Sequence, residues 1–410
     1  MNIVLTTDYF PPHIGGVEKV TYELANQLCR MGHRVAVCTL GNESTKSIEN
    51  SDGVRVYTAR SHESTGILGV QSAFSSVAGR LIRSVCKKER ADVIHSNNLY
   101  YLTTIAASAS KKGLNLPLVT TLHIGTTARL DVGIRFLTMA YERSIGKWIL
   151  DQSDHIIAVS SAVKEYARGL NVSESKISVI PNGIDVSEIR PNHFHQRKAN
   201  LRIAFVGRLI ANKGPQYLLE TAPTVLREFP EVEFLFVGDG PLQGLLRRSA
   251  KTLGISERVR FLPAVPSIPE FLRECDIYVR PSLTEGMPLT VLEAMASGVP
   301  TIATSIEGTR EIITHGENGF LVAPKSAEQL KFYISKLVSD PELRIKMGKR
   351  ARETMEKHND WATVAVQTSR VYENVLSQHR KDSSRTNPAR KAGFVISTAP
   401  QRIKNTPICV

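Results

Sequence analysis

Short apolar segments alternate with helical segments along this chain, in two series separated by a polar stretch at residues 186–200. Residues 2–7 (NIVLTT) are typical of a buried strand, and a helical pattern over 17–31 and a second strand at 34–40 follow them. A new strand at 201–206 begins the second series. Alternation of strand and helix predicts βαβ units with parallel strands. The 410 residues are enough for two domains, each with its own core.

The composition is that of an ordinary globular protein, with 42% hydrophobic and 22% charged residues. No apolar run approaches the roughly 18 residues that a membrane-spanning helix needs. The N-terminus, MNIVLTTDYF, reads as a first strand and lacks the basic segment of a signal peptide. The five cysteines are scattered, which favours a reducing, cytoplasmic compartment and argues against a disulfide framework or a zinc site: Cys29, Cys38, Cys86, Cys275 and Cys409.

The net charge of +13 is unevenly distributed. Residues 1–198 carry a net +6, residues 199–379 a net +1, and residues 380–410 a net +6. A basic surface favours an anionic lipid, a nucleic acid or an acidic substrate without choosing among them. The last segment is rich in Ser, Asn and Pro and poor in hydrophobic periodicity, so we expect residues 380–410 to form a basic disordered tail.

Two helical segments of the first half carry basic residues. In residues 76–90, four of them recur at helical spacing on one face: Arg80, Arg83, Lys87 and Arg90. Such a face is either simply solvated or docks on an anionic membrane. Residues 131–150 predict an amphipathic helix that is either core packing or a second interfacial element, and it carries Arg135, Arg143, Lys147 and Trp148.

Residues 282–298 (SLTEGMPLTVLEAMASG) combine a strand-to-helix turn with an unusual placement of charge. An apolar strand at 276–280 leads into the turn, and Pro288 opens a helix that is apolar on nearly every side and therefore expected to be buried. Glu293 lies inside that helix, and Glu285 lies at its mouth, eight residues earlier. A buried carboxylate needs a partner. Because free N–H groups at a helix N-terminus bind anions, this turn is a candidate anion site.

Three further loops follow strands and carry residues suited to binding. Gly15 and Gly16 precede the first helix, without the GxGxxG spacing of a nicotinamide site. In the loop GRLIANKG, Arg208 and Lys213 are suited to hold a diphosphate, while two solvated loop cations are the alternative. His123 directly follows the strand LVTTL, and parallel-sheet enzymes place ligand groups at the C-terminal ends of strands.

The segment PSLTEGMPLTVLEAMASGVPTIAT resembles the paired-glutamate signature of retaining, nucleotide-sugar-dependent glycosyltransferases, in particular glycosyltransferase family 4. The PNGID turn at 181–185 and the Arg-x4-Lys pair of GRLIANKG resemble the same family, and the resemblance covers about residues 2–378. It implies an α/β chain of the GT-B fold, in which two doubly wound Rossmann-like domains face a cleft. The acceptor-binding domain would span 1–195, completed by a returning helix at 361–378, and the donor-binding domain would span 196–360.

By this resemblance, the donor is a nucleoside-diphosphate sugar, and neither a cofactor nor a metal is expected. Glu293 would accept hydrogen bonds from the ribose, and Glu285 would bind hydroxyls of the sugar. His123 would lie beside the donor sugar or the acceptor, although Ile124 departs from the Asp or Gly that often follows it. The implied catalytic residues are His123, Glu285, Arg208 and Lys213. The implied donor-binding residues are Gly15, Gly16, Arg208, Lys213, Glu285, Gly286, Met287, Pro288, Leu289, Thr290 and Glu293.

The resemblance predicts a retaining hexosyltransferase. The basic first half favours a lipid-linked or polysaccharide acceptor at the cytoplasmic membrane face, with an anionic membrane as candidate partner and no nucleic acid. A sugar-nucleotide epimerase of the same fold, a soluble sugar synthase and a non-catalytic lipid- or sugar-binding scaffold stay open as alternatives. A product assay separates the epimerase, and activity without lipid indicates the synthase. The complete set of Arg208, Lys213, Glu285 and Glu293 argues against the scaffold. GDP-mannose, UDP-glucose and UDP-N-acetylglucosamine all fit as donors.

Overall fold

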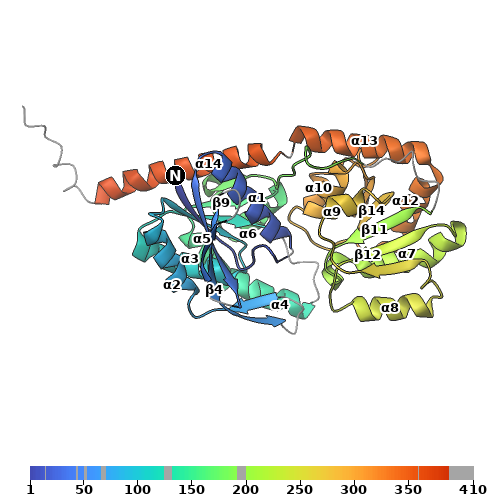
Figure 1. Cartoon of the computed structure of the whole chain (residues 1–410), viewed down its shortest axis with the longest axis horizontal. Helices are drawn as coiled ribbons and strands as arrows, with labels where there is room; N and C mark the ends of the chain where they lie inside the picture. Colours follow the sequence, from blue (N-terminus) through green and yellow to red (C-terminus); the bar gives the residue numbers. More distant parts are fainter. Residues whose placement is uncertain are drawn as a thin grey trace, which may run out of the picture.

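The computed structural model contains two α/β units, each built on its own sheet (Figure 1). The first unit lies to the left in Figure 1 and the second to the right, and helix α14 runs along the upper side of the first. The predicted domain boundary between residues 195 and 196 falls outside the described part of the chain. The structure describes residues 1–13, 15–42, 45–49, 53–65, 71–123, 132–191, 200–358 and 360–386.

The first sheet has eight strands in the order β10-β9-β8-β7-β1-β2-β4-β3, and every pair is parallel except β3 with β4. Its strands are β1 (Asn2–Thr6), β2 (Arg34–Gly41), β3 (Thr45–Glu49), β4 (Arg55–Arg60), β7 (Val93–Asn97), β8 (Leu118–Leu122), β9 (His155–Ala158) and β10 (Ile177–Val179). Strands β5 (His62–Thr65) and β6 (Gln71–Phe74) form a separate antiparallel hairpin.

Successive side chains along a strand point to opposite faces, and in the first sheet both sets are apolar. Helices therefore cover both faces of this sheet. In β1, Val4 packs with Ile82 and Ala107 of helices α2 and α3, whereas Ile3 and Leu5 point to the opposite face. That opposite face packs against helices α1, α5, α6 and α14. The helices are α1 (Gly16–Arg30), α2 (Ala78–Lys88), α3 (Leu102–Leu114), α4 (Val132–Tyr141), α5 (Lys147–Gln152) and α6 (Ser161–Gly169), with a π-helical turn at Glu142–Gly146.

The second sheet has six parallel strands in the order β13-β12-β11-β14-β15-β16. They are β11 (Arg202–Val206), β12 (Glu233–Val237), β13 (Val259–Leu262), β14 (Ile277–Arg280), β15 (Thr301–Thr304) and β16 (Phe320–Val322). Phe205 and Phe236 face α7, α8 and α12, while Ala204 and Tyr278 face α9, α10 and α13. The helices are α7 (Pro215–Glu228), α8 (Gln243–Thr252), α9 (Ile268–Leu272), α10 (Leu289–Ala296), α11 (Glu307–Arg310), α12 (Ala327–Ser339) and α13 (Pro341–His358).

Helix α14 (Trp361–Thr386) returns from the second unit and packs against α1 of the first (Figure 1). The helix predicted at 361–378 therefore continues to Thr386, and the prediction of disorder from residue 380 is wrong for residues 380–386. The extension has a simple cause, because no Gly or Pro occurs between Trp361 and Pro388. Residues 387–410 of the predicted tail lie outside the described part of the chain.

Candidate active site

The loops that follow β11 and β14 lie against each other at the C-terminal edge of the second sheet. Gly214, in the first loop, has φ of +75° and approaches the carbonyl of Pro281 in the second so closely that a Cβ there would lie 2.0 Å from the oxygen. Only glycine tolerates both the conformation and the contact. A hydrogen bond also joins the loops, because the N–H of Leu283 donates to the carbonyl of Asn212 at 2.8 Å. The two predicted binding loops therefore pack directly against each other.

Glu285 is the centre of a buried ion network where these two loops meet. Its Oε2 accepts a hydrogen bond from Nζ of Lys213 at 2.8 Å, and its Oε1 accepts from Nη2 of Arg280 at 2.7 Å and Oγ of Ser282 at 2.8 Å. Burial alone would raise the pKa of Glu285, but the charges of Lys213 and Arg280 lower it to about 2. Glu285 is therefore ionised and holds both cations in place.

Arg280 was missed by the sequence reasoning, which treated it only as the end of a strand. Its side chain is 6% exposed, and Nη1 donates to the carbonyl of Val206 on β11 at 2.7 Å. A charge at the end of the apolar strand IYVR, central in the sheet, was the signal available. Lys213 and Arg280 with the single anion Glu285 leave this network with net positive charge.

Glu293 lies on α10 and is 1% exposed. Its Oε1 accepts from Nζ of Lys19, on α1 of the first unit, at 2.5 Å, and within the described residues its Oε2 has no hydrogen-bond partner. Burial raises the pKa of Glu293, and the charge of Lys19 opposes this effect. The two glutamates of the motif therefore have different surroundings.

The residues between these glutamates form the turn that leads into α10. Met287 is buried, and its carbonyl accepts from Nδ2 of Asn182 at 3.0 Å. The helix begins at Leu289, one residue later than predicted, because Pro288 keeps an extended ψ of 112°. The hydroxyl of Tyr278 donates to Oγ1 of Thr290 at 2.7 Å. Gly286 is in close contact with Gly308 at the start of α11. A Cβ added to Gly308 would lie 2.3 Å from the carbonyl oxygen of Gly286.

Arg208 and the glycine pair lie where the two units face each other. Arg208 is exposed on the loop after β11. Burial raises the pKa of Glu18, in the first turn of α1, and the charge of Arg208 acts in the opposite direction. The Glu18 carboxylate covers Gly15, because a Cβ on Gly15 would lie 2.1 Å from Glu18 Oε2, whereas a Cβ on Gly16 would meet open space. A carboxylate thus lies over one of the two predicted donor-binding glycines at this helix N-terminus.

His123 follows β8 and is 8% exposed. Its Nε2 lies 3.4 Å from Oδ1 of Asn97, at the end of the adjacent strand β7. Burial lowers the pKa of His123 to about 4, so the ring is neutral at pH 7. Asp8, which follows β1, caps α3 by accepting from the backbone N–H groups of Leu102 and Thr103 at 2.8 Å. Polar groups from three neighbouring strands therefore gather at this edge of the first sheet.

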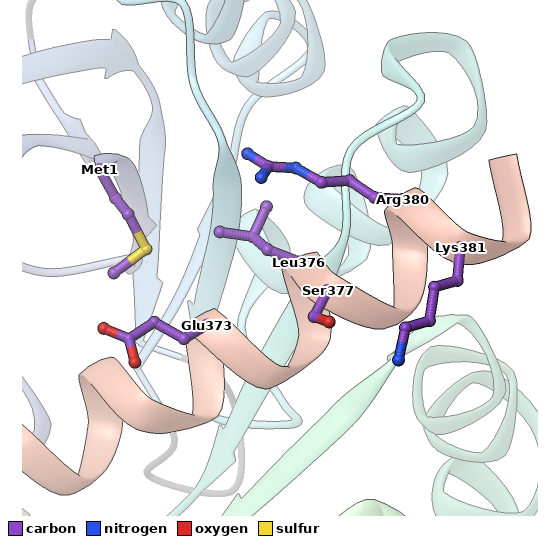
Figure 2. Close-up of a pocket in the computed structure, with 6 residues that line it drawn as sticks. All are labelled: Met1, Glu373, Leu376, Ser377, Arg380 and Lys381. Atoms are coloured by element: carbon purple, nitrogen blue, oxygen red, sulfur yellow. The ribbon is translucent and has the colours of Figure 1, made fainter. Parts of the chain in front are cut away.

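Contacts between the two units surround these residues. Besides the Lys19–Glu293 pair and the Asn182–Met287 bond, Glu311 accepts from the backbone N–H groups of Ser161 at 2.9 Å and Ala162 at 3.1 Å, at the start of α6. Glu293 and the turn before α10 thus lie at an interface with the first unit. A separate hollow of about 520 Å³ lies beside Met1 and one face of α14 (Figure 2), and none of the predicted site residues lines it.

Neither a metal cluster nor a membrane-spanning helix occurs in the part of the chain that the structure describes. Among those residues, no group of three or more His, Cys, Asp or Glu side chains is placed to hold a metal ion. Within the same ranges, no helix is long and apolar enough to cross a membrane.

The fold and the site define a class of protein, a GT-B glycosyltransferase that uses a nucleotide sugar. Residues 14–188 match the family model described as Glycosyltransferase Family 4, and residues 186–354 match the model described as Glycosyl transferases group 1. The chain belongs to glycosyltransferase family 4. The resemblance inferred from the paired glutamates is thereby confirmed.

Curated relatives and a solved structure agree with this assignment. An uncharacterized glycosyltransferase of Methanocaldococcus jannaschii, MJ1607, is 29% identical, over 91% of this chain and 98% of that protein. A phosphatidylinositol N-acetylglucosaminyltransferase subunit of Arabidopsis thaliana is 27% identical, over 92% of this chain and 82% of that protein. The structure of Anabaena Alr3699/HepE in complex with UDP and glucose shares the fold, with a TM-score of 0.74 and 20% identity, over 90% of this chain and 99% of that one.

Proposed function

We propose that the chain is a retaining hexosyltransferase that transfers a sugar from a nucleoside diphosphate to a lipid-linked or polysaccharide acceptor at the cytoplasmic membrane face. The observation that carries the donor side is the buried network of Glu285 with Lys213 and Arg280. Preorganised cations stabilise charge that develops on a diphosphate leaving group. Exposed Arg208 and the N-terminus of α10 add further positive potential on the same edge of the sheet.

In this proposal the remaining residues bind and orient. Glu293 offers Oε2 to a ribose hydroxyl, and neutral His123 exchanges hydrogen bonds with the donor sugar or the acceptor without adding charge. The acceptor hydroxyl attacks from the face that the diphosphate leaves, within a close ion pair, so the anomeric configuration is retained. Because Lys213, Arg280 and Arg208 supply the positive charge, we propose that the reaction does not require a divalent metal.

The acceptor proposal is supported by an exposed apolar stripe on α4 and the segment after it. Phe136 is 72% exposed and Leu137 is 58% exposed, and Trp148 lies further along the same segment at 39%. Exposed Arg135 and Arg143 flank these side chains. An apolar stripe with basic neighbours is typical of a helix that lies in the interface of an anionic membrane. The name of the Arabidopsis relative, a phosphatidylinositol N-acetylglucosaminyltransferase, further supports a lipid acceptor.

A thermal-shift screen tests the donor side. The protein is heated with UDP, GDP, ADP and their sugars, with and without EDTA. A ligand at 100 times its dissociation constant stabilises the folded state by about 2.7 kcal/mol, which raises the melting temperature measurably. A shift with one nucleotide that EDTA leaves unchanged supports the metal-independent transferase. A shift that EDTA abolishes refutes the metal-independent part, and no shift with any of them favours the binding scaffold.

Vesicle sedimentation tests the acceptor side. We expect the protein to sediment with vesicles that contain phosphatidylglycerol and to stay in solution with phosphatidylcholine alone, because the flanking arginines need an anionic surface. The double variant F136S/L137S should lose this binding and keep its nucleotide-induced thermal shift. Transfer to soluble sugars at full rate without lipid would indicate a sugar synthase instead, and an NMR assay of the product's anomeric proton checks retention.

A further inference from the structure

An ion pair joins the first turns of α1 to the middle of α10. Nζ of Lys19 lies 2.5 Å from Oε1 of Glu293, and the two residues are 274 positions apart in the sequence. Lys19 lies three residues after Gly16 of the predicted donor-binding pair Gly15 and Gly16, within the first turn of α1. The lysine side chain is 39% exposed, whereas its partner is 1% exposed. The pair therefore links the first unit to a buried carboxylate of the donor unit.

The carboxylate of Glu293 is only half satisfied. Its Oε2 is buried and has no hydrogen-bond partner in the described part of the chain. A buried acceptor without a partner has lost its hydrogen bonds to water and gained none in exchange, and the cost is larger when the group is charged. The helix around it is apolar, with Leu292 and Ala294 both buried. A ligand that brings a hydroxyl to Oε2 would remove this cost.

We propose that Lys19 is a positioning residue for the donor, whose ammonium group fixes the Glu293 carboxylate so that Oε2 accepts a hydrogen bond from a ribose hydroxyl. The inference rests on the proposed function, in which Glu293 binds the ribose. One consequence concerns the arrangement of the units. Because Lys19 belongs to the first and Glu293 to the second, the ribose is held at full strength only while the two units are in contact.

Experiment can separate this role of the pair from a simpler one. If Lys19 served only to hold the units together, its loss would weaken every nucleotide equally. If it acts through Glu293 on the ribose, its loss weakens only ligands that carry the hydroxyl. The informative measurement is therefore a cycle between the Lys19→Met substitution and removal of a ribose hydroxyl from the ligand.

The experiment is isothermal titration calorimetry of the full chain with UDP, GDP and ADP, followed by the 2′-deoxy and 3′-deoxy forms of whichever binds. We expect Lys19→Met to weaken the ribonucleotide roughly tenfold to a hundredfold, as expected for a hydrogen bond to a charged group. It should leave the affinity for one of the two deoxynucleotides unchanged. Lys19→Arg should restore most of the affinity, because the guanidinium also donates to a carboxylate.

Lys331→Met is the matched control. Lys331 is 40% exposed and is paired with Glu228 at 3.8 Å, away from the site residues. This substitution should change no affinity. If Lys19→Met lowers the melting temperature strongly, Lys19→Gln provides the same comparison.

Two results would overturn the inference while leaving the proposed function intact. One is unchanged ribonucleotide affinity in Lys19→Met, and the other is an equal loss for the ribonucleotide and both deoxynucleotides. A wild-type protein that binds none of the three nucleotides contradicts the proposed function itself, so the two failures are distinguishable.

Discussion

Replacement of Glu285 by Gln tests the buried ion network directly. The side chain is 8% exposed, and the substitution leaves buried Arg280 and partly buried Lys213 as neighbouring cations without their counter-ion. Breaking a buried pair in this way costs about 3 to 5 kcal/mol. The lowering of the Glu285 pKa from 4.5 to about 2 gives a similar magnitude, roughly 3 kcal/mol. For a domain of this size the melting temperature should fall by roughly 6 to 20 °C.

The effect of pH on this variant has a definite sign. Because the folded-state pKa of Glu285 lies below its ordinary value of 4.5, its stabilisation is fully present above pH 4.5 and is lost as the pH falls toward about 2. The difference between wild type and variant should therefore narrow below pH 4.5. Urea denaturation followed by circular dichroism at several pH values measures this difference.

Glu274→Gln is the control for this prediction. Glu274 is 56% exposed and lies 3.7 Å from Arg202. An exposed pair contributes at most about 1 kcal/mol, so this variant should unfold almost like the wild type. The reasoning would be refuted if Glu285→Gln were as stable as Glu274→Gln, or if its deficit stayed constant between pH 7 and pH 3.

Three further substitutions test activity, stability or both. Arg208→Ala should reduce transfer by orders of magnitude in initial-rate assays, while its exposed position keeps the unfolding free energy within about 0.5 kcal/mol of wild type. Gly308→Ala should lower both activity and melting temperature, because the new Cβ would lie 2.3 Å from the Gly286 carbonyl oxygen and displace the turn after Glu285. Gly169→Ala is the control, since a Cβ at that position meets open space. Glu311→Gln should cost about 1 kcal/mol in urea denaturation, because the carboxylate caps α6, and an unchanged midpoint would contradict this.

Local signals in the sequence were sufficient for most elements of both sheets. Buried parallel strands such as Ile203 to Val206 are continuous apolar runs, and Gly or Pro marks many of their ends. No element was predicted from the sequence for residues 41–75, although strands β3 to β6 lie in this region. The segments TKSIE and HEST lack the apolar alternation that identifies a strand. An edge strand and an isolated hairpin need not have a continuous apolar face.

The C-terminal helix shows a related gap between pattern and structure. Its apolar periodicity ends near Leu376, yet the helix continues to Thr386. Hydrophobic spacing reports only where a helix packs, while its length also depends on backbone hydrogen bonds and on the absence of Pro. The sequence therefore predicted the buried part of α14 and not its projecting end.

Sequence motifs could not identify ion-pair partners that are distant in the sequence. The spacing of Glu285 and Glu293 indicated a site, but Lys19 gave no signal of its own, because it is an ordinary lysine near the start of an amphipathic helix. Its partner becomes evident only in the folded structure, where Nζ of Lys19 meets Oε1 of Glu293 on α10. Arg280 could have been identified from the sequence, since a charged residue in a central buried strand requires a partner.

The two glutamates of one motif have opposite electrostatic surroundings, and this contrast divides their roles. Glu285 receives hydrogen bonds from two cations and a hydroxyl, and its pKa is lowered. In the proposed function it therefore holds Lys213 and Arg280 in place for the diphosphate. Glu293 has one cation, a raised pKa and an oxygen without a partner among the described residues. In the proposed function this oxygen gains its hydrogen bond only when a ligand binds. A fully satisfied carboxylate stabilises the empty protein, whereas a half-satisfied one keeps part of its interaction energy for binding.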